Sequence, residues 1–380
     1  MRSPTVSVII PVYNQAQFIG QTIDSVLAQT FSDYEIIVVD DASTDNTAKI
    51  LAGYGDCLRV ITLKTNTGPA ITRNIALGVA QGEFIAFLDS DDMWYLRRLD
   101  ITVSYLRKNL NVDLVCGAWD HIDEAGRTIE KLNQPSNYQP QVDIDFLRTL
   151  VVRGNLLATS ALLIRRKCFE CCGLFDTNLK RSMDWDLWLR MAAHGHKIAM
   201  IDQPVSRYRR HQTNLTLNPQ RMEEATRQVL VKLFSNDQLA VRLADLQEHA
   251  YIDSWLRLAG LAHEAGLEKD THRFIQMARE LYPKAVPNYA LSFNYLEKLF
   301  LLPAAEEFML MIATAMPEVR PLYSWMMMRR YLQKGDYKSA SLKLCKLAAS
   351  RPGWLLEKAT RRIRRELVLV RNKSVSIRLN

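Results

Sequence analysis

The sequence of 380 residues contains no run of about 18 uncharged apolar residues, which is the length that a membrane-spanning helix requires. The nearest candidates are interrupted, one by Asn14 and Gln15 and the other by Glu306 and Glu307. The first residues lead into a strand-like segment without the layout of a signal peptide. We therefore expect a cytoplasmic protein.

Cysteine is scarce, and the cysteines lack the regular spacing of a disulfide framework. Six cysteines are scattered over the chain, which favours reduced thiols over disulfides. Cys168, Cys171 and Cys172 contain a CxxC pattern, a common half of a zinc site. A second ligand pair at suitable spacing is missing from the sequence, so ordinary helix packing is favoured over metal binding for these three residues.

Glycine is missing where a dinucleotide fold requires it. The predicted first strand is followed by Tyr13, Asn14 and Gln15 instead of G-x-G-x-x-G, which disfavours a nicotinamide enzyme. A nucleotidyltransferase is disfavoured for a related reason, because its first turn would be Gly-rich and basic to bind a triphosphate. A nucleotide whose phosphates are neutralised by a metal fits this turn better.

The formal net charge of +8 is distributed unevenly. Residues 358–380 contain eight Lys or Arg against Glu366 alone, so this tail carries +7. Such a segment suits peripheral contact with the anionic inner face of the plasma membrane, and a solvated helix end is the alternative. Nucleic-acid binding is not expected, because the tail lacks interleaved aromatic residues.

Apolar runs alternate with helical patterns through the first 90 residues. The sequence predicts strands at 6–12, 35–39, 58–63 and 84–88, with helices at 17–28, at 45–52 and from residue 68. This alternation is typical of an α/β domain with a largely parallel sheet covered on both faces. Ligands bind at the carboxyl ends of such strands. The polar residues at those ends are Asn14, Asp41, Asp89 and Asp91.

Beyond residue 215 the pattern becomes helical throughout. Three alanines recur every 35 residues, each on a helix that we expect a proline to close: Ala278, Ala313 and Ala348, with Pro283, Pro317 and Pro352. Gly266 and Gly335 are predicted to lie at equivalent turns. This period favours an array similar to tetratricopeptide repeats, with an irregular helical bundle as the alternative.

We therefore predict three parts: an α/β domain at 1–217, an all-α domain at 218–357 and the basic tail at 358–380. The helical domain offers a surface for a protein partner or for positioning an acceptor.

The strongest local signal is the run of Asp89, Ser90, Asp91 and Asp92. Carboxylates two residues apart on an extended segment point the same way, so Asp89 and Asp91 can converge on one divalent cation, such as Mg²⁺ or Mn²⁺, or on a cation and a ribose. A helix N-cap cluster is the alternative reading.

Seven ordered segments between Val6 and about Thr216 resemble glycosyltransferase family 2, with its GT-A fold. They read VSVIIPVYNQAQFIGQTIDSVLAQTF, EIIVVDDASTDNT, NTGPAITRNIAL, GEFIAFLDSDDMW, GLFD, MDWDLWLRMA and YRRHQTNLT. The resemblance implies a Rossmann-like, mostly parallel sheet. The helical region lies outside it.

The resemblance also implies roles for individual residues. Nucleotide-sugar binding would fall to Pro11, Tyr13, Asp41, Arg73, Asp89 and Ser90, with Arg73 near the diphosphate. Metal binding would fall to Asp91 and His211. Asp40 and Asp92 are further candidates for contact with the donor.

Asp184 matches the acid that acts as the catalytic base in this family, where the preceding residue is usually glutamate and here is Met183. Asp186 lies on a different side of the expected helix and is interpreted as a structural or acceptor-contacting acid.

These observations predict an inverting, metal-assisted transfer from a nucleotide sugar, with a UDP-sugar favoured, to a glycan or lipid-linked glycan, as in polysaccharide biosynthesis. The alternative is a catalytically idle nucleotide-binding scaffold.

Overall fold

The computed structural model describes residues 3–130, 145–211, 214, 218–285, 311, 312 and 314. The chain divides into two compact units, Met1–Ala250 and Tyr251–Asn380. The segment between residues 218 and 250 therefore packs with the α/β part. The domain limits expected at residues 217 and 357 stay predictions.

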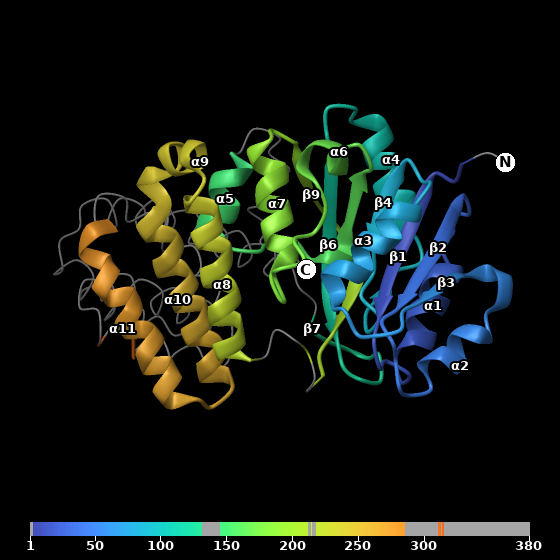
Figure 1. The fold of residues 1–380 in the computed structure, drawn as a ribbon, viewed down its shortest axis with the longest axis horizontal. Helices are drawn as coiled ribbons and strands as arrows, with labels where there is room; N and C mark the ends of the chain where they lie inside the picture. The colour runs from blue at the N-terminus through green and yellow to red at the C-terminus, as the bar shows by residue number, and fades with distance from the viewer. Residues whose placement is uncertain are drawn as a thin grey trace, which may run out of the picture. The chain divides into compact units, whose positions relative to one another are not determined.

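Within the described residues of the first unit, the strands belong to one sheet (Figure 1). They are β1 (Val6–Val12), β2 (Tyr34–Asp40), β3 (Arg59–Thr62), β4 (Phe84–Phe87), β5 (Met93–Trp94), β6 (Leu114–Ile122), β7 (Thr128–Glu130), β8 (Leu162–Arg165) and β9 (Ile198–Arg209). The helices are α1 (Ile19–Leu27), α2 (Thr47–Ala52), α3 (Pro69–Val79), α4 (Arg98–Lys108), α5 (Phe146–Arg153), α6 (Cys168–Cys172), α7 (Met183–Ala193), α8 (Pro219–Phe234) and α9 (Asp237–Arg242). The elements predicted before residue 90 all form, each within two residues of its expected bounds.

The strand order is β3-β2-β1-β4-β8-β6-β9-β5, with β7 paired to β6. The strands β1 to β4 pair in parallel, as does β6 with β9. β8 runs antiparallel to both β4 and β6, and β5 and β7 also pair antiparallel. The α/β fold class is confirmed, but the sheet is mixed rather than mostly parallel. The reason is that the strands after β4 enter the sheet in both directions instead of following crossover helices one by one.

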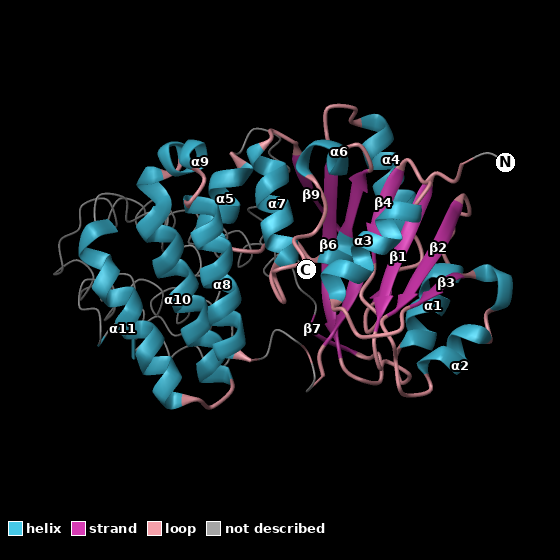
Figure 2. Ribbon diagram, in the orientation of Figure 1, coloured by secondary structure: helices cyan, strands magenta, loops and turns pink. Residues whose placement is uncertain are grey.

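Helices cover both faces of this sheet (Figure 2). On one face, Val8 of β1 belongs to the same apolar core as Ile23 of α1 and Val103 of α4. On the other face, the Phe87 ring of β4 contacts the rings of Phe169 and Phe175 in edge-to-face geometry. Alternate residues of the strands thus enter two separate cores, which fixes the strand register.

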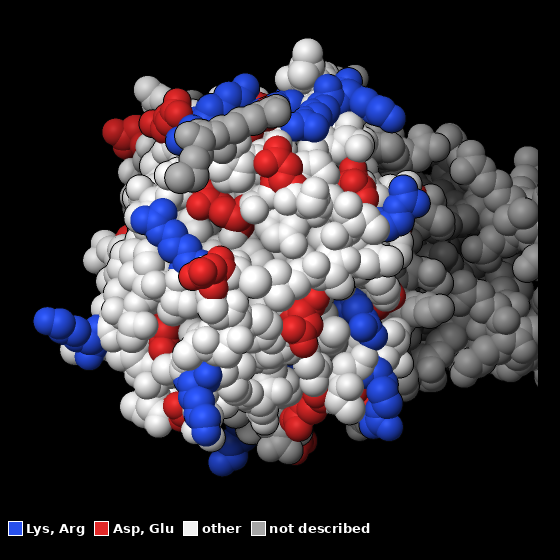
Figure 3. Space-filling view, turned by 90° about the vertical axis from the view of Figure 1, so that its right-hand side faces the viewer, with Lys and Arg blue, Asp and Glu red and all other residues white. Residues whose placement is uncertain are grey.

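The charges on the first unit are mixed on the face viewed in Figure 3, which is the side of α2 and β3 in Figure 1. Basic and acidic side chains are interspersed over the described surface there. The strongly basic segment 358–380 lies outside the described residues. Among the residues that the structure does describe, no helix is both long and apolar enough to span a bilayer.

The longest described part of the second unit is a helical hairpin. Residues 251–264 of α10 (Gln247–Glu264) and α11 (Glu268–Ala285) are joined by a turn in which Gly266 has φ 70°, as predicted for this glycine. The rings of Trp255 and Phe274 stack between the two helices with centroids 6.5 Å apart.

One detail of the predicted repeat is wrong. α11 continues two residues beyond Pro283, because a proline in the last turn removes only one backbone hydrogen bond. The later repeat positions, Ala313, Gly335, Ala348, Pro317 and Pro352, lie outside the described residues, so the repeat stays a prediction.

Candidate active site

The carboxyl ends of β1 and β2 lie side by side, because Pro11 pairs with Val39 and Val12 pairs with Asp40. Pro11 is buried, whereas Tyr13, the first residue after β1, is 44% exposed. The aromatic ring of Tyr13 is therefore available to a ligand at this edge of the sheet.

Asp41 follows β2 and is almost fully buried. Its Oδ1 accepts hydrogen bonds from the backbone N–H of Thr67 at 2.7 Å and from the Thr67 hydroxyl at 2.9 Å. Its Oδ2 accepts from the N–H of Gly68 at 2.7 Å. Asp41 therefore ties the end of β2 to the residues that start α3. A carboxylate has about four acceptor positions, so one is left for another donor.

The turns after β1 and β2 have unusual backbone conformations. Asn14 has φ 51° and Ala42 has φ 61°, values that residues with a Cβ seldom adopt. Asn14 Oδ1 accepts from the backbone N–H of Thr44 at 2.7 Å, which joins the two turns. Asp40 is buried, and its Oδ1 accepts from the N–H of Ser43 at 3.0 Å. Such strain is typical of binding and catalytic sites, and the Asp40 carboxylate serves to shape the turn.

Asp89 lies just after β4, where Arg73 of α3 donates from Nη2 to its Oδ1 at 2.5 Å. The Arg73 guanidinium is buried and lies 5.6 Å from the centre of the Phe175 ring. Burial raises the pKa of Asp89; Arg73 opposes the increase, while the charges of Asp91 and Asp184 add to it. Three carboxylates therefore share one electrostatic environment, in which a bound cation would be favoured.

Asp91 and His211 meet although β4 and β9 are far apart in sequence. Asp91 Oδ2 lies 2.8 Å from His211 Nε2, and the His211 side chain is only 2% exposed. The Asn214 amide nitrogen lies 3.1 Å from the same Nε2, and the imidazole packs 5.0 Å from the ring of Phe18. A carboxylate oxygen and an imidazole nitrogen at this separation match two adjacent ligands of a six-coordinate cation, about 2.9 Å apart.

Asp92 is buried, and both of its oxygens already have partners within the protein. Oδ1 accepts from the backbone N–H of Arg209 at 2.9 Å, and Oδ2 accepts from the hydroxyl of Ser160 at 2.6 Å. Burial raises the pKa of Asp92 well above its usual range, and the charges of Asp91 and Asp89 raise it further. Asp92 is therefore placed to hold β9 against the Asp-rich turn rather than to face a ligand.

Ser90 is buried as well. Its carbonyl accepts from the Thr22 hydroxyl at 2.9 Å, and the same hydroxyl contacts the Asp92 carbonyl at 2.8 Å. The turn that carries the acids is thus fixed to α1.

Arg209 is a site residue that the sequence reasoning did not select. It is fully buried, and its Nε donates to the Asp91 carbonyl at 2.6 Å. Nη1 donates to the carbonyls of Asp123 at 3.0 Å and Glu124 at 2.7 Å, while the guanidinium lies 4.7 Å from the Phe18 ring centre. Its partners are mostly backbone carbonyls of distant segments, and a sequence gives no sign of such contacts.

Asp184 is the second residue of α7. Its Oδ2 accepts from the Asn155 amide at 2.6 Å and from the Thr159 hydroxyl at 3.2 Å, and Oδ1 accepts from the N–H of Trp185 at 2.9 Å. Ser182, just before the helix, has φ 53°. The carboxylate is therefore held by two donors from the segment between α5 and β8 and remains half-buried at the helix N-terminus, where negative charge is favoured.

Asp186 has a different environment from Asp184. It is buried, and its Oδ2 pairs with Arg190 at 2.9 Å while Oδ1 pairs with Lys232 of α8 at 2.8 Å.

The structure thus brings five of the predicted site residues into one region: Arg73, Asp89, Asp91, His211 and Asp184. The carboxylates of Asp40, Asp92 and Asp186 are instead engaged with the protein itself.

Comparisons with known proteins agree with this arrangement. Residues 7–172 match the model of glycosyl transferase family 2. An uncharacterized glycosyltransferase of Rickettsia typhi is 36% identical over 191 residues, covering 50% of this chain and 58% of the relative. An uncharacterized glycosyltransferase of Methanocaldococcus jannaschii is 30% identical over 216 residues, covering 55% of this chain and 72% of the relative. The chain spans 31% of the length of a further relative from Rickettsia felis.

Solved structures share the fold. A mannosyltransferase from Pyrobaculum calidifontis, in complex with GDP-Man and Mn²⁺, aligns with a TM-score of 0.53 at 20% identity over 83% of this chain and 86% of that one. S. aureus TarS 1-349, in complex with UDP-GlcNAc, aligns with a TM-score of 0.51 at 19% identity over 91% of this chain and 92% of that one. At these identities the likeness shows the GT-A fold alone. The family match and the relatives establish that the chain belongs to glycosyl transferase family 2.

Proposed function

We propose that this chain transfers a sugar from a nucleotide-sugar donor to a hydroxyl group of a glycan or lipid-linked glycan, with inversion at the anomeric carbon. The observation that carries the proposal is the Asp91–His211 pair, 2.8 Å apart and next to the Arg73–Asp89 ion pair. A metal-binding pair beside a cationic side chain suits a nucleoside diphosphate, which carries negative charge and needs both.

The nucleotide base is proposed to bind between Tyr13 and Asp41. Tyr13 offers an exposed ring for stacking, and Asp41 has one acceptor position left after its three hydrogen bonds to Thr67 and Gly68. A ring N–H of uracil would fill that position. We favour a UDP-sugar as donor.

A divalent cation, Mg²⁺ or Mn²⁺, fits Asp91 and His211 by ligand type and by spacing. When bound, it would act as a Lewis acid that stabilises the departing nucleoside diphosphate. Asp89 is engaged by Arg73, so its carboxylate is proposed to orient that guanidinium and to contact the ribose.

Asp184 is proposed to act as the general base. It is half-buried, and Asn155 and Thr159 fix the orientation of its carboxylate. In a single displacement the acceptor hydroxyl loses its proton to this carboxylate as its oxygen attacks the anomeric carbon. The C–O bond to the diphosphate breaks on the opposite face, which inverts the configuration.

The acceptor itself is a proposal from the sequence. A glycan of a surface polysaccharide, or its lipid-linked form, fits the predicted membrane contact through residues 358–380 and the helical region as a partner or acceptor surface. The cytoplasmic location proposed from the sequence agrees with a nucleotide-sugar donor.

A donor screen tests the proposed function. Thermal unfolding would be followed with UDP-, GDP- and dTDP-sugars, each with Mn²⁺ and with EDTA, in the natural chain and in Asp91→Ala. We expect one nucleotide to raise the unfolding temperature in the presence of Mn²⁺ and the increase to disappear in Asp91→Ala. If no donor stabilises the protein, both the proposed transfer and the nucleotide-binding scaffold lose their support.

A transfer assay separates these two functions when a donor does bind. Release of the nucleoside diphosphate in the presence of a glycan acceptor supports the enzyme. Tight donor binding without release, for acceptors across the polysaccharide classes, supports the scaffold.

A further inference from the structure

We propose that Cys171, Cys172 and His196 bind one Zn²⁺ ion on the first unit, separate from the Asp91–His211 pair. Cys171 Sγ lies 3.0 Å from His196 Nε2 and 3.6 Å from Cys172 Sγ. Each ligand atom of this trio lies within 4.8 Å of the other two. Two thiolates and one imidazole are a ligand set that zinc prefers.

The three ligands come from two elements that the sequence does not relate. Cys171 and Cys172 end the short helix α6, whereas His196 lies in the turn between α7 and β9. A CxxC pattern alone favoured helix packing, because no second ligand pair was visible at a suitable spacing. The trio keeps Cys171 of that pattern, leaves out Cys168, and takes in Cys172 and His196, which lies 24 positions beyond Cys172.

The spacing of the two sulfur atoms is close to what zinc requires, whereas the 3.0 Å between Cys171 Sγ and His196 Nε2 must lengthen to about 3.6 Å. With Zn–S bonds of about 2.3 Å and tetrahedral angles, two sulfurs bound to one ion lie about 3.8 Å apart. The Sγ atoms of Cys171 and Cys172 are 3.6 Å apart. The side chains need only small movements to close around an ion, and solvent would provide the fourth ligand.

Asp113 prepares the histidine for this role. Its Oδ2 lies 3.1 Å from His196 Nδ1, so Nδ1 carries the proton and Nε2 presents its lone pair to the thiols. Asp113 is itself held by Lys167 Nζ at 3.1 Å and by the backbone N–H of Lys197 at 3.3 Å. A carboxylate bonded to the outer nitrogen of a ligating histidine is a recurrent feature of zinc sites.

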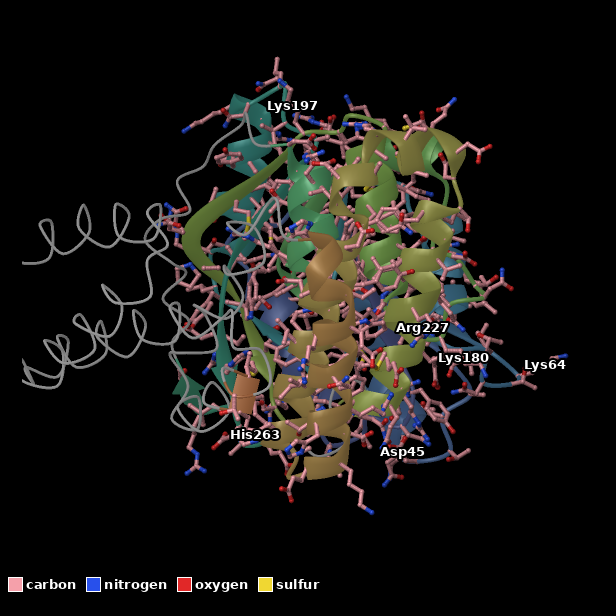
Figure 4. All side chains as sticks on the ribbon, turned by 90° about the vertical axis from the view of Figure 1, so that its left-hand side faces the viewer. Asp45, Lys64, Lys180, Lys197, Arg227 and His263 are labelled. Carbon is pink, nitrogen blue, oxygen red and sulfur yellow. The ribbon has the colours of Figure 1, made fainter. Side chains whose placement is uncertain are left out.

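The charges around the three residues and their access to solvent also suit a zinc ion. Two thiolates neutralise Zn²⁺, and Lys167 offsets the charge of Asp113. Cys171 is exposed, and Lys197, labelled in Figure 4, marks the exposed turn that follows His196. An ion can therefore reach the site from solvent without unfolding of the core.

The site would stabilise the side of the sheet that carries the candidate base. The Cys172 carbonyl accepts a hydrogen bond from Arg190, which also pairs with Asp186 on the helix of Asp184. A metal that fixes the end of α6 to the turn before β9 therefore fixes two neighbours of α7.

Cobalt titration tests the proposal, because thiolates bound to Co²⁺ give an intense near-ultraviolet charge-transfer band that carboxylate and histidine ligands do not. The reduced, metal-free full chain would be titrated with Co²⁺ and then with Zn²⁺. We expect one equivalent of Co²⁺ to produce the band and Zn²⁺ to abolish it. Absence of the band in the natural chain would overturn the site.

Variants assign the ligands. Cys171→Ser and His196→Gln should each weaken Co²⁺ binding, so that one equivalent gives a clearly diminished band, whereas Cys57→Ser, which removes another exposed cysteine, should keep the full band. Asp113→Asn should keep the band but weaken zinc affinity about 10–100-fold, as measured by competition with a chromophoric chelator. An undiminished band in Cys171→Ser or His196→Gln would refute that residue as a ligand and with it the proposed trio.

Discussion

Asp91 Oδ2 and His211 Nε2 lie 2.8 Å apart although 120 residues separate them in the chain. The contact joins the turn after β4 to the residues that follow β9. Arg209 strengthens the same junction, since its backbone N–H bonds Asp92 and its Nε bonds the Asp91 carbonyl. The two proposed metal ligands are therefore positioned before any ion binds, which reduces the ordering cost of binding.

The first prediction concerns this pair. His211→Gln should weaken the Mn²⁺-dependent binding of the donor nucleotide at least about tenfold, or about 1.4 kcal/mol, because one of two protein ligands is lost. Calorimetric titration of the nucleotide with Mn²⁺ and with EDTA measures the effect. His194→Gln is the matched control, since His194 is exposed at the end of α7. Equal affinities in both variants would exclude His211 as a ligand.

The second prediction concerns the base. Asp184→Asn keeps the shape and the hydrogen bond from Trp185 but cannot take up a proton. The turnover number should fall about 10²–10⁴-fold, with donor affinity unchanged. Steady-state rates of diphosphate release, together with nucleotide binding measured on the same sample, distinguish loss of catalysis from loss of binding. A variant that keeps more than about a tenth of the rate would assign the base elsewhere.

Asp186→Asn provides a contrast from the same helix. The Asp186 carboxylate pairs with Arg190 and Lys232, so its neutral replacement should lower the free energy of unfolding by about 2 kcal/mol. This is below the value for fully buried pairs, because Lys232 is 41% exposed. The turnover number of the folded fraction should stay close to that of the natural chain. A large loss of turnover without loss of stability would make Asp186 the better candidate for the base.

A third prediction concerns the nucleotide base. In Asp41→Asn, the amide group must direct an N–H toward one of the three donors that now bond the carboxylate. Thr67 or Gly68 then loses its acceptor, and we expect about 1–3 kcal/mol less stability. Affinity for the free nucleoside diphosphate should fall in parallel. Chemical denaturation and nucleotide titration measure the two effects, and unchanged values for both would show that Asp41 does not organise this loop.

The sequence predicted the elements around the proposed donor site well, because each of these elements has a strong local pattern. Val6–Val12 forms β1 at the predicted residues, and Pro69 begins α3 directly after Gly68, whose φ of 90° only glycine adopts readily. The acids at the strand ends follow from the same pattern, since parallel strands bring their carboxyl ends to one edge. Asp41 and Asp89 were selected as candidates for this reason.

The contacts that the sequence could not give are those between distant segments. Asn155 and Thr159 orient Asp184 from the region between α5 and β8, and neither has a local signal of function. Arg209 is buried among backbone carbonyls, which have no signature in sequence. The antiparallel strand β8 was likewise missed, since a short apolar run does not reveal its direction in a sheet.

The last prediction concerns acid stability at the junction of residue 176 with α8. Lys232 Nζ lies 2.5 Å from Asp176 Oδ2, and this hydrogen bond, opposed by partial burial, lowers the pKa of Asp176. A lowered folded-state pKa means that the pair stabilises the fold above about pH 4 and that this contribution is lost as the pH falls through the folded-state value. Asp176→Asn should therefore be less stable than the natural chain by about 0.5–1 kcal/mol at pH 7.

The difference in stability between Asp176→Asn and the natural chain should shrink toward zero in acid, because the carboxyl group of Asp176 in the natural chain is then neutral as well. Urea denaturation at a series of pH values from 7 down to about 3 measures it. Asp202→Asn serves as the matched control, since Asp202 is exposed on β9, and its difference should be near zero at every pH. If the Asp176→Asn difference is the same across the whole series, packing rather than charge connects residue 176 to α8, because only a charge effect titrates with the carboxyl.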